Sequence, residues 1–401
     1  MDKIYNHRLF QFVQDHLQED PAHLLLKYSP SHDLDLKEAV RQIAARQKAR
    51  GKLPTWVNHP RVIFPVSLSL EQSSSELTAK FKSRFVQGAT LLDLTGGLGV
   101  DTLIMGKKFQ EVLYIERNVQ LSRIAAHNFS LLSQTSSKFQ VKSTDSLEYL
   151  KNTDRIFDWL YADPDRRGLQ NQKYFRLDDC EPNIPANWHL LKNKADNIMV
   201  KASPMLDVKA VIKALPDVRQ VLVVAVKNEV KEVLLLWKKH DVGGTVKISA
   251  YDLGPEQEQR FDFTFEAEEE SPVRYEMPSG YLLEPNAAIL KAGAFKSFAS
   301  HHGLAKLHPN THLYTLPEIR GEIPGRVFRI FQEVKLDKKV LKQLFPSGMV
   351  NVLVRNHPLK AQNLKKKYGL KDGGKEFLIA TTTKDGKARA FWCGRMGEEI
   401  V

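Results

Sequence analysis

The sequence feature that most constrains the fold is a glycine-rich turn between two apolar runs, within residues 89–116. This segment, ATLLDLTGGLGVDTLIMGKKFQEVLYIE, has apolar runs at 90–94 and 112–115, with the glycines and a helix-like stretch between them. Short apolar runs bounded by turn residues are typical of buried parallel strands, and a helix usually connects such strands. The pattern therefore predicts the first half of a nucleotide-binding α/β domain.

The glycines and two acids indicate the kind of ligand. Without a Cβ atom, Gly96, Gly97 and Gly99 let the backbone turn tightly and approach a ligand closely. Glu116 stands 23 residues after Asp93, at the end of the second strand, where a carboxylate can accept both hydroxyl protons of a ribose. Asp93 would repel a pyrophosphate and attract an ammonium group, so S-adenosylmethionine fits better than a dinucleotide. The alternative is a βαβ unit whose glycines serve only helix packing.

The stretch resembles the first two motifs of class I S-adenosylmethionine-dependent methyltransferases. The resemblance implies that Asp93 and the turn face the methionine part of the cofactor and that Glu116 faces the ribose. It also implies that Asp145, after a third strand at 138–143, accepts a hydrogen bond from the adenine amino group. An Asp that begins a helix is also an ordinary N-cap, and the two roles are compatible. The cofactor residues implied are Asp93, Thr95, Gly96, Gly97, Gly99, Glu116, Asp145 and Asp163.

A second candidate site follows the fourth predicted strand, 157–162, in the sequence DPDRR. It resembles motif IV of amino-methyltransferases, an acid or amide followed by Pro-Pro and an aromatic residue. Asp163 is retained, but Asp165 and Arg166 replace the second proline and the aromatic residue that stacks on a flipped base. Arg166 and Arg167 would instead hold a phosphate in bidentate fashion. A salt-bridged turn is the alternative.

A different catalytic pattern resembles the Lys-Asp-Lys-Glu tetrad of ribose 2′-hydroxyl methyltransferases. Lys80 or Lys82, Asp163, Lys201 and Glu229 stand at roughly the matching elements. A lysine near a second lysine in a partly buried site can have a pKa low enough to help deprotonate a hydroxyl. Lysines are common in this chain, so chance placement is the alternative. The predicted catalytic residues are Asp163, Arg166, Arg167 and Lys201.

The α/β pattern continues to about residue 270. Further strands are predicted at 197–201 and 221–226, a helix is predicted to lead to Trp237, and the stretches 246–253 and 261–266 form an antiparallel pair. We therefore expect a Rossmann-like, seven-stranded class I methyltransferase domain at 75–270, after a mostly helical segment at 1–74. The resemblance implies that Gln72, Ser73 and Lys80 line the cofactor mouth, although helix capping and a solvated face explain them equally well. Ser73 with Glu76 fits a capping box, which predicts Ser73 as an N-cap.

The last part of the chain is strongly basic. Residues 335–401 contain 15 Lys and Arg against 6 Asp and Glu, and the whole chain has a net charge of +12. Clustered positive charge is expected of a surface that binds a polyanion, with a solvated surface as the alternative. Arg355, Lys365, Lys366 and Lys367 would contact RNA phosphates, unless the lysines are simply a solvated helix face.

The segments EPNAA at 284–288 and RNHPL at 355–359 resemble modules appended to a bacterial group of predicted RNA methyltransferases. The resemblance implies two small α+β domains, ferredoxin-like at 271–334 and THUMP-like at 335–401. No apolar run approaches the roughly 20 residues of a membrane span, and the N-terminus lacks the apolar core of a signal peptide. Neither the two cysteines nor the histidines have metal-ligand spacing, so we expect no metal and a cytoplasmic location.

These observations predict a class I methyltransferase that transfers a methyl group from S-adenosylmethionine to ribosomal or transfer RNA. Two other functions are compatible with the sequence. A non-catalytic adaptor with this fold would bind RNA and transfer nothing, and a methyltransferase for protein or a small molecule would need no basic tail. The sequence carries no signal for oligomeric state.

Overall fold

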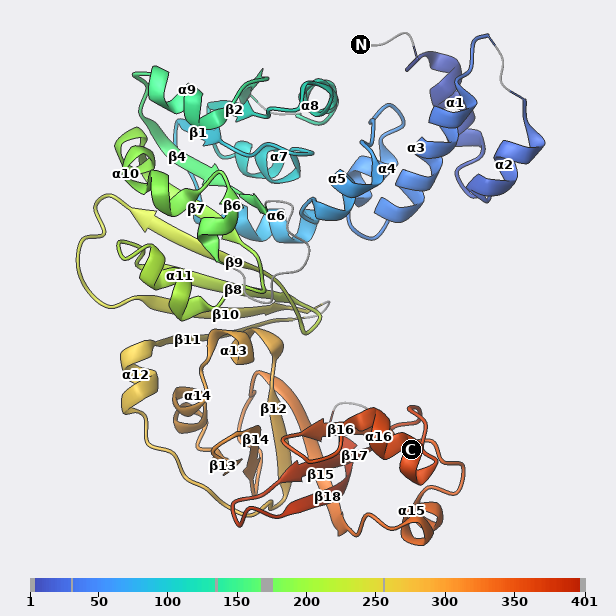
Figure 1. Ribbon diagram of the computed structural model, residues 1–401, viewed down its shortest axis with the longest axis vertical. Helices are drawn as coiled ribbons and strands as arrows, with labels where there is room; N and C mark the ends of the chain where they lie inside the picture. Colours follow the sequence, from blue (N-terminus) through green and yellow to red (C-terminus); the bar gives the residue numbers. More distant parts are fainter. Residues whose placement is uncertain (1–3, 30–31, 134–135, 167–175, 255–256, 397–401) are drawn as a thin grey trace. The chain divides into compact units, whose positions relative to one another are not determined.

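In the computed structural model, the structure describes residues 4–29, 32–133, 136–166, 176–254 and 257–396. The chain divides into two compact units. The first comprises residues 1–202, 210–217 and 235–242, and the second comprises residues 203–209, 218–234 and 243–401. Figure 1 shows the course of the chain through both units.

The first unit is built on five parallel strands in the order β3-β2-β1-β4-β7. Because β1 has the later strand β4 on one side and β2 on the other, the chain reverses its direction of winding beside β1. Ligands of open α/β sheets bind outside the carboxyl ends of the strands at such a point. The strands are β1 (Thr90–Asp93), β2 (Glu111–Ile115), β3 (Lys138–Lys142), β4 (Phe157–Ala162) and β7 (Ala195–Ala202).

Helices cover both faces of this sheet. The helices α7 (Val100–Gly106) and α8 (Val119–Leu132) lie on one face, and α9 (Ser146–Asn152) and α10 (Ile184–Lys194) lie on the other (Figure 1). Burial on both faces explains why β1 and β4 are nearly continuous apolar runs. This arrangement confirms the predicted α/β fold of the methyltransferase type.

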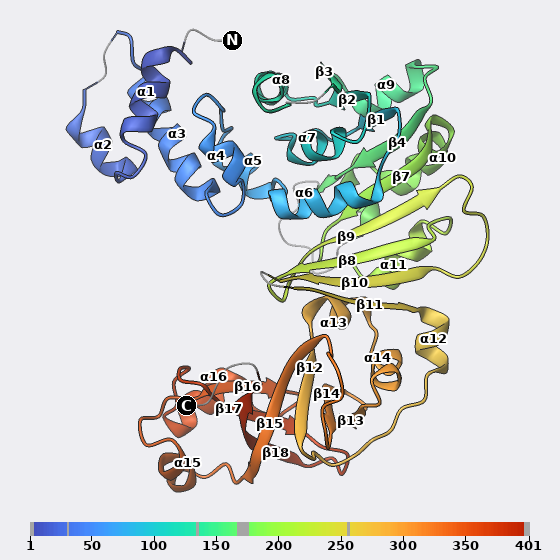
Figure 2. The ribbon, with the colours of Figure 1, turned by 180° about the vertical axis from the view of Figure 1, so that it is seen from behind.

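The chain before β1 is mostly helical, as predicted, and leads through α6 into the sheet (Figure 2). Residues from α3 and α4, among them Ala49 and Trp56, share one buried core with Leu103 of α7 and Phe129 of α8. The side-chain amide of Asn128 pairs with both the N–H and the C=O of residue 63, at 2.9 and 2.8 Å. The helices are α1 (His7–Asp15), α2 (Pro21–Lys27), α3 (Leu36–Ala49), α4 (Pro54–Asn58), α5 (Ser67–Gln72) and α6 (Glu76–Lys82).

The predicted N-cap at Ser73 is wrong. The residue that caps α6 is Ser75, whose hydroxyl accepts a hydrogen bond of 3.1 Å from the N–H of Thr78. Ser73 ends α5 instead. The carboxylate of Glu76 accepts hydrogen bonds of 2.7 Å from the N–H and the hydroxyl of Thr55, so it is engaged away from the helix start and forms no capping box.

The second unit contains the end of the α/β part of the chain. Its strands follow the order β9-β8-β10-β11, with β10 parallel to β8 and antiparallel to β11. The predicted antiparallel pair is therefore confirmed. The strands are β8 (Gln220–Val226), β9 (Glu229–Lys238), of which residues 229–234 belong to this unit, β10 (Lys247–Leu253) and β11 (Glu258–Thr264).

The predicted helix leading to Trp237 is wrong, because β9 occupies that segment. Lys227 and Asn228 have φ angles of 51° and 62°, the values of a type I′ turn, which joins β8 and β9 as a hairpin. Residues 232–236 are buried, and those after Glu232 form a short apolar run that fits a buried strand or a helix equally well. With β9, and without counting the short strands β5 (Asp165–Arg166) and β6 (Cys180–Glu181), the α/β part of the chain has nine strands among the described residues rather than seven.

The last part of the second unit is a five-stranded sheet with helices α15 (Lys338–Leu344) and α16 (Ala361–Tyr368) (Figure 2). Its neighbouring strands are antiparallel except for the parallel pair β16 and β17, in the order β12-β15-β18-β17-β16. The strands are β12 (Tyr281–Pro285), β15 (Gly325–Val334), β16 (Asn351–Arg355), β17 (Glu376–Thr382) and β18 (Ala388–Arg395). Within the described residues, no helix is long and apolar enough to cross a membrane.

Candidate active site

A cavity of about 390 Å³ opens at the carboxyl ends of β1, β2 and β4 in the first unit. Its size lies in the range of roughly 300–1,000 Å³ that is usual for small-molecule sites. The cavity is lined by the turn after β1, the start of α7, the ends of β2 and β4, and the residue before α9. All eight predicted cofactor residues line it: Asp93, Thr95, Gly96, Gly97, Gly99, Glu116, Asp145 and Asp163. Gln72 and Ser73 line it too.

Asp93 ends β1 and is almost completely buried, with 1% of its surface exposed. Its carboxylate accepts a hydrogen bond of 2.9 Å from the N–H of Thr95 and another from the hydroxyl of Thr102. Burial raises the pKa of Asp93 to about 7, and the nearby charges of Asp101 and Asp163 act in the same direction. Asp93 is therefore an acid whose charge changes near neutral pH.

The glycine turn is required by both packing and backbone conformation. A Cβ atom at Gly96 would lie 2.2 Å from the ring of Tyr114, so no side chain fits there. Gly97 and Gly99 have φ angles of 58° and 83°, in the left-handed region that favours glycine. The N–H of Gly97 donates a hydrogen bond of 3.0 Å to Glu116, which fixes the turn against the end of β2.

Glu116 and Asp145 each hold backbone groups at the cavity wall. The second carboxylate oxygen of Glu116 accepts a hydrogen bond of 2.7 Å from the N–H of Asn118. Asp145 is the N-cap of α9 and accepts a hydrogen bond of 2.9 Å from the N–H of Glu148. The capping role of Asp145 is confirmed, and its place in the cavity lining leaves its predicted role toward adenine as a prediction.

Asp163 lies at the end of β4, in contact with two other strand ends. Its N–H donates a hydrogen bond of 2.6 Å to the hydroxyl oxygen of Thr95. The ammonium of Lys201, on β7, donates a hydrogen bond to its carboxylate. The side chain of Lys201 is 13% exposed and that of Asp163 is 33% exposed, so the ion pair is partly shielded from water. The structure thus brings together two of the four predicted catalytic residues.

The other two predicted catalytic residues are only partly covered by the structure. The backbone of Arg166 forms β5 (Asp165–Arg166), which pairs with β6 (Cys180–Glu181). The side chain of Arg166, and Arg167 as a whole, lie outside the described residues. The predicted contact of these arginines with a phosphate therefore stays a prediction.

The residues of the predicted tetrad lie in different environments. Lys82 is fully buried and forms an ion pair of 3.2 Å with Asp101, whereas Lys80 is exposed. Glu229 belongs to the second unit, is exposed and forms an ion pair of 2.7 Å with Lys231. Of the tetrad positions, Asp163 and Lys201 are the ones that the structure joins directly.

Sequence reasoning missed two groups of residues in the cavity wall. One is a hydrogen-bonded cluster of Ser74, Asp101 and Tyr161. The other is the segment from β6 to the first part of α10, where β6 pairs with β5 of the DPDRR motif. The only sequence signal for the first group is a charged residue in the otherwise apolar start of α7. The residues of the second group that line the cavity are Glu181, Pro182, Asn183 and Asn187.

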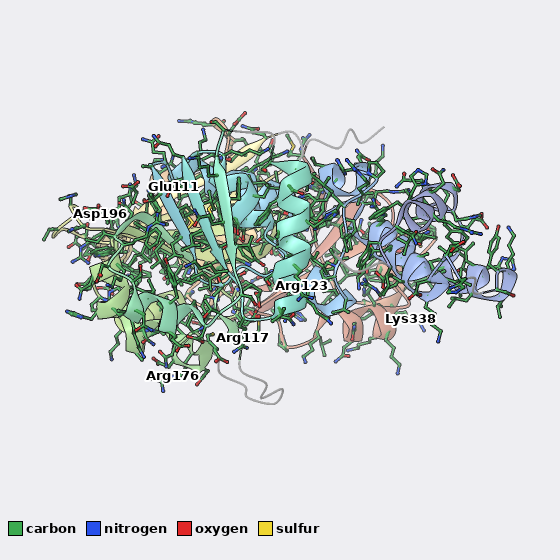
Figure 3. All side chains as sticks on the ribbon, turned by 90° about the horizontal axis from the view of Figure 1, so that it is seen from above. Glu111, Arg117, Arg123, Arg176, Asp196 and Lys338 are labelled. Carbon is green, nitrogen blue, oxygen red and sulfur yellow. The ribbon has the colours of Figure 1, made fainter. Side chains whose placement is uncertain are left out.

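The cavity is strongly acidic. Among the described residues, seven carboxylates and one arginine line it, so its potential favours a cationic ligand and opposes a phosphate. The arginine is Arg117, which follows the end of β2, whereas Glu111 begins that strand at its other end (Figure 3). The carboxylates belong to Asp93, Asp101, Glu116, Asp145, Asp163, Asp165 and Glu181. This set of groups fits the amino, sulfonium and ribose groups of S-adenosylmethionine. No group of three or more possible metal-ligating side chains is found within the described part of the chain.

The predicted RNA contacts lie in the second unit. The guanidinium of Arg355 binds the carboxylate of Glu284, a residue with 2% exposure that also binds Arg326. Lys365 forms an ion pair of 2.5 Å with Asp372. Lys366 and Lys367 are exposed on α16. Two of the four predicted residues are thus engaged within the protein, and two face solvent.

Comparison with known proteins gives similarities along the whole chain. A family model describing a ferredoxin-like domain matches residues 281–324, and one described as THUMP domain-like matches residues 325–395. The crystal structure of a "putative methyltransferase" from Porphyromonas gingivalis W83 is 33% identical, with a TM-score of 0.88, over 97% of this chain and 98% of that one.

Two sets of curated proteins are also similar. An uncharacterized S-adenosylmethionine-dependent methyltransferase from Mycobacterium tuberculosis is 20% identical over 318 residues, which cover 78% of this chain and 83% of that protein. The ribosomal RNA small subunit methyltransferase J from Francisella tularensis subsp. novicida is 32% identical over 81 residues. That match covers 19% of this chain and 34% of the Francisella protein.

Proposed function

Because the chain belongs to the family of S-adenosylmethionine-dependent methyltransferases with ferredoxin-like and THUMP-like C-terminal domains, we propose that it methylates RNA. The observation that carries this proposal is the ion pair of Lys201 with Asp163 at the wall of a carboxylate-lined cavity. The THUMP-like segment and the partial similarity to a ribosomal RNA methyltransferase support RNA as the acceptor.

The cofactor side of the site consists of the groups on the first two strands. Asp93 and the glycine turn would hold the amino-acid part of S-adenosylmethionine, Glu116 the ribose and Asp145 the adenine. S-adenosylmethionine supplies a methyl group that is activated by its bond to a positive sulfur. The acidic lining attracts a cation and, where water is excluded, does so more strongly than it would in solution.

The acceptor side would be organised by Asp163. Its backbone is fixed by Thr95, and its carboxylate is oriented by the ammonium of Lys201. Asp163 would orient the acceptor group or take its proton. General-base catalysis of this kind typically raises the reaction rate by about 10²–10⁴-fold. Arg166 and Arg167 would bind a phosphate of the acceptor nucleotide.

Each alternative function would not need one of the groups that the proposed function uses. An RNA-binding adaptor would not need the Lys201–Asp163 pair. A methyltransferase for protein or a small molecule would not need the exposed lysines of α16. Removing residues 335–401 does not separate these functions cleanly, because β15 pairs with β18 and the deletion would break the five-stranded sheet.

Point substitutions test the proposal without that damage. Label transfer from S-adenosylmethionine should be measured with RNA, DNA and protein as acceptors, for the wild type, Asp163→Asn and Lys366→Ala/Lys367→Ala. An RNA methyltransferase loses transfer in the first variant and shows a raised KM for RNA in the second. Transfer of label to protein that is unchanged by the lysine substitutions contradicts RNA as the substrate.

A further inference from the structure

A buried ion pair lies beneath the candidate cofactor cavity and is not explained by the proposed reaction. Lys82, on α6, has 0% exposure, and its Nζ atom lies 3.2 Å from Oδ1 of Asp101 on α7. The other oxygen of Asp101 accepts hydrogen bonds of 2.6 Å from the hydroxyls of Ser74 and Tyr161. Ser74, Asp101 and Tyr161 all line the cavity.

Packing alone does not require this pair. Ala79 of α6 and Val100 and Leu103 of α7 already belong to one apolar core, so the two helices are held together without charges. Removing two charges from water is costly, and well-packed apolar residues in place of a buried ion pair are often neutral or stabilising. The pair therefore calls for an explanation in terms of the site.

The position of Asp101 connects it to Asp93. The hydroxyl of the next residue, Thr102, donates a hydrogen bond to the carboxylate of Asp93. Burial is the main cause of the raised pKa of Asp93, and the charge of Asp101 adds to it. Burial alone would also raise the pKa of Asp101, but the charges of Lys82 and Lys201 hold it below its ordinary value.

The charged and titratable groups around Asp93 and Asp101 come from five elements. Asp101 faces Asp93 from α7 and Asp163 from the end of β4. Tyr114 lies on β2, where burial raises its pKa and the charges of Glu116 and Asp93 raise it further. Lys201, on β7, binds Asp163 and also lowers the pKa of Asp101. Lys82 is the cation that lies against Asp101 from the protein interior.

We propose that Lys82 is a positioning residue of the cofactor site: by pairing with Asp101 it offsets the charge beside Asp93 and so favours the carboxylate form of Asp93 that binds a cationic ligand. The inference rests on the proposed function, because it takes S-adenosylmethionine as that ligand. Beyond the proposed function, the inference states that Lys82, a residue with no exposed surface, sets the pH range in which the site binds its cofactor.

The test is the affinity for S-adenosylmethionine, measured by calorimetry from about pH 5.5 to 8 for the wild type, Lys82→Met and Asp101→Asn. The affinity of the wild type is expected to increase as the pH rises through about 7, the pKa of Asp93. In Lys82→Met the charge of Lys201 still favours the carboxylate form of Asp101, so this midpoint should move upward by about one unit, which is a roughly tenfold loss of affinity at pH 6.5. Asp101→Asn should move the midpoint downward. The α-amino group of the cofactor, which titrates near pH 8, is common to all measurements.

The opposite signs separate a charge effect from a structural one. An ion pair that merely holds α6 to α7 would weaken cofactor binding in both variants. It would not move the two pH midpoints in opposite directions. Lys107→Met removes an exposed lysine at the end of α7 and serves as the matched control, with no expected shift. Thermal unfolding of each variant shows whether it is folded at the temperature of the titration.

If Lys82→Met does not fold, the double variant Lys82→Met/Asp101→Asn replaces it, because that variant leaves no lone charge in the interior. Its midpoint should then lie above that of Asp101→Asn alone. Midpoints that coincide, or that move in the same direction for both single variants, overturn the inference while leaving the proposed function intact. A wild-type protein that binds no S-adenosylmethionine at any pH contradicts both.

Discussion

The backbone N–H of Asp163 donates a hydrogen bond of 2.6 Å to the hydroxyl oxygen of Thr95. Thr95 belongs to the glycine-rich turn after β1, and its own N–H donates to Asp93. The bond therefore joins the turn that would hold the cofactor to the strand end that would hold the acceptor. Reactions that depend on alignment benefit from such a rigid link, since small displacements of reacting groups reduce the rate strongly.

Asp163→Asn should lower the rate of methyl transfer while leaving cofactor binding nearly unchanged. The substitution keeps the backbone bond to Thr95 but removes the charge that pairs with Lys201. We expect kcat to fall by about 10²-fold or more and the Kd for S-adenosylmethionine to change by less than about threefold. Single-turnover kinetics and calorimetry measure the two quantities. Asp154→Asn, at an exposed position, is the control, and an unchanged kcat in Asp163→Asn would remove Asp163 from the catalytic residues.

Gly97→Asp should abolish cofactor binding and cost the fold only about 1–3 kcal/mol, the strain of a side chain at a φ angle of 58°. Gly97 lines the cavity, and a Cβ atom there would meet only the carbonyl oxygen of Thr95 at 3.7 Å, so the new side chain would fill ligand space rather than clash with the core. Its carboxylate would also lie beside Glu116. We expect an affinity at least about a hundredfold weaker, measured by calorimetry. Gly51→Asp, at a glycine with open space around it, should bind normally. Equal affinities in the two variants would show that the turn is not part of the site.

The raised pKa of Asp93 predicts a cost in stability that depends on pH. Its pKa rises from 3.8 to about 7 on folding, so between these values the folded protein binds a proton that the unfolded chain has lost. The free energy of unfolding should therefore fall as the pH rises through this window and level off above it. Each unit of pKa corresponds to about 1.4 kcal/mol, so the contribution is about 4 kcal/mol at most.

Asp93→Asn removes this effect and should therefore stabilise the protein above pH 7 while weakening cofactor binding. Chemical unfolding of the wild type and the variant at pH 5 and pH 8 measures the difference, which should be larger at pH 8. A variant that is less stable than the wild type at pH 8 would show that Asp93 is not destabilised by burial.

The lysines of α16 and Arg355 should respond differently to substitution. Lys366→Ala/Lys367→Ala removes two exposed charges. The slope of log affinity for RNA against log salt concentration should therefore fall by the contribution of about two phosphate contacts, without a change in stability. Arg355→Ala leaves the buried Glu284 with Arg326 alone and should destabilise the second unit by about 2 kcal/mol. Filter binding over a salt series and thermal unfolding separate the two effects. Lys338→Ala/Lys339→Ala, on the exposed side of α15, is the matched control pair, and an equal loss in it would mean that α16 has no special role.

The sequence predicted the parts of the fold whose signal is local. Three glycines between two apolar runs require a tight turn between buried strands, and the structure has that turn, with Gly96 packed against Tyr114. The strand β9 was missed because residues buried on both faces lose the alternation that distinguishes a strand from a helix. The N-cap at Ser75 was missed because Glu76 is engaged by Thr55, which is distant in the sequence.

The same distinction applies to the candidate site. Residues at strand ends, such as Asp93, Glu116 and Asp163, could be placed together because parallel strands end at one edge of a sheet. The pair of Lys82 with Asp101 could not, since it depends on how α6 packs on α7. Burial of a lysine is set by tertiary contacts, and the local sequence around Lys82 is that of an ordinary amphipathic helix.

The most direct test of the central claim is transfer of a labelled methyl group from S-adenosylmethionine by the purified protein. RNA, DNA and protein from a strain that lacks the gene serve as separate acceptors, and Asp163→Asn serves as the inactive control. The account predicts label in RNA alone, absent with the variant, and nucleoside digestion then identifies the methylated atom. Label in no fraction, with S-adenosylmethionine still bound by the wild type, would contradict it.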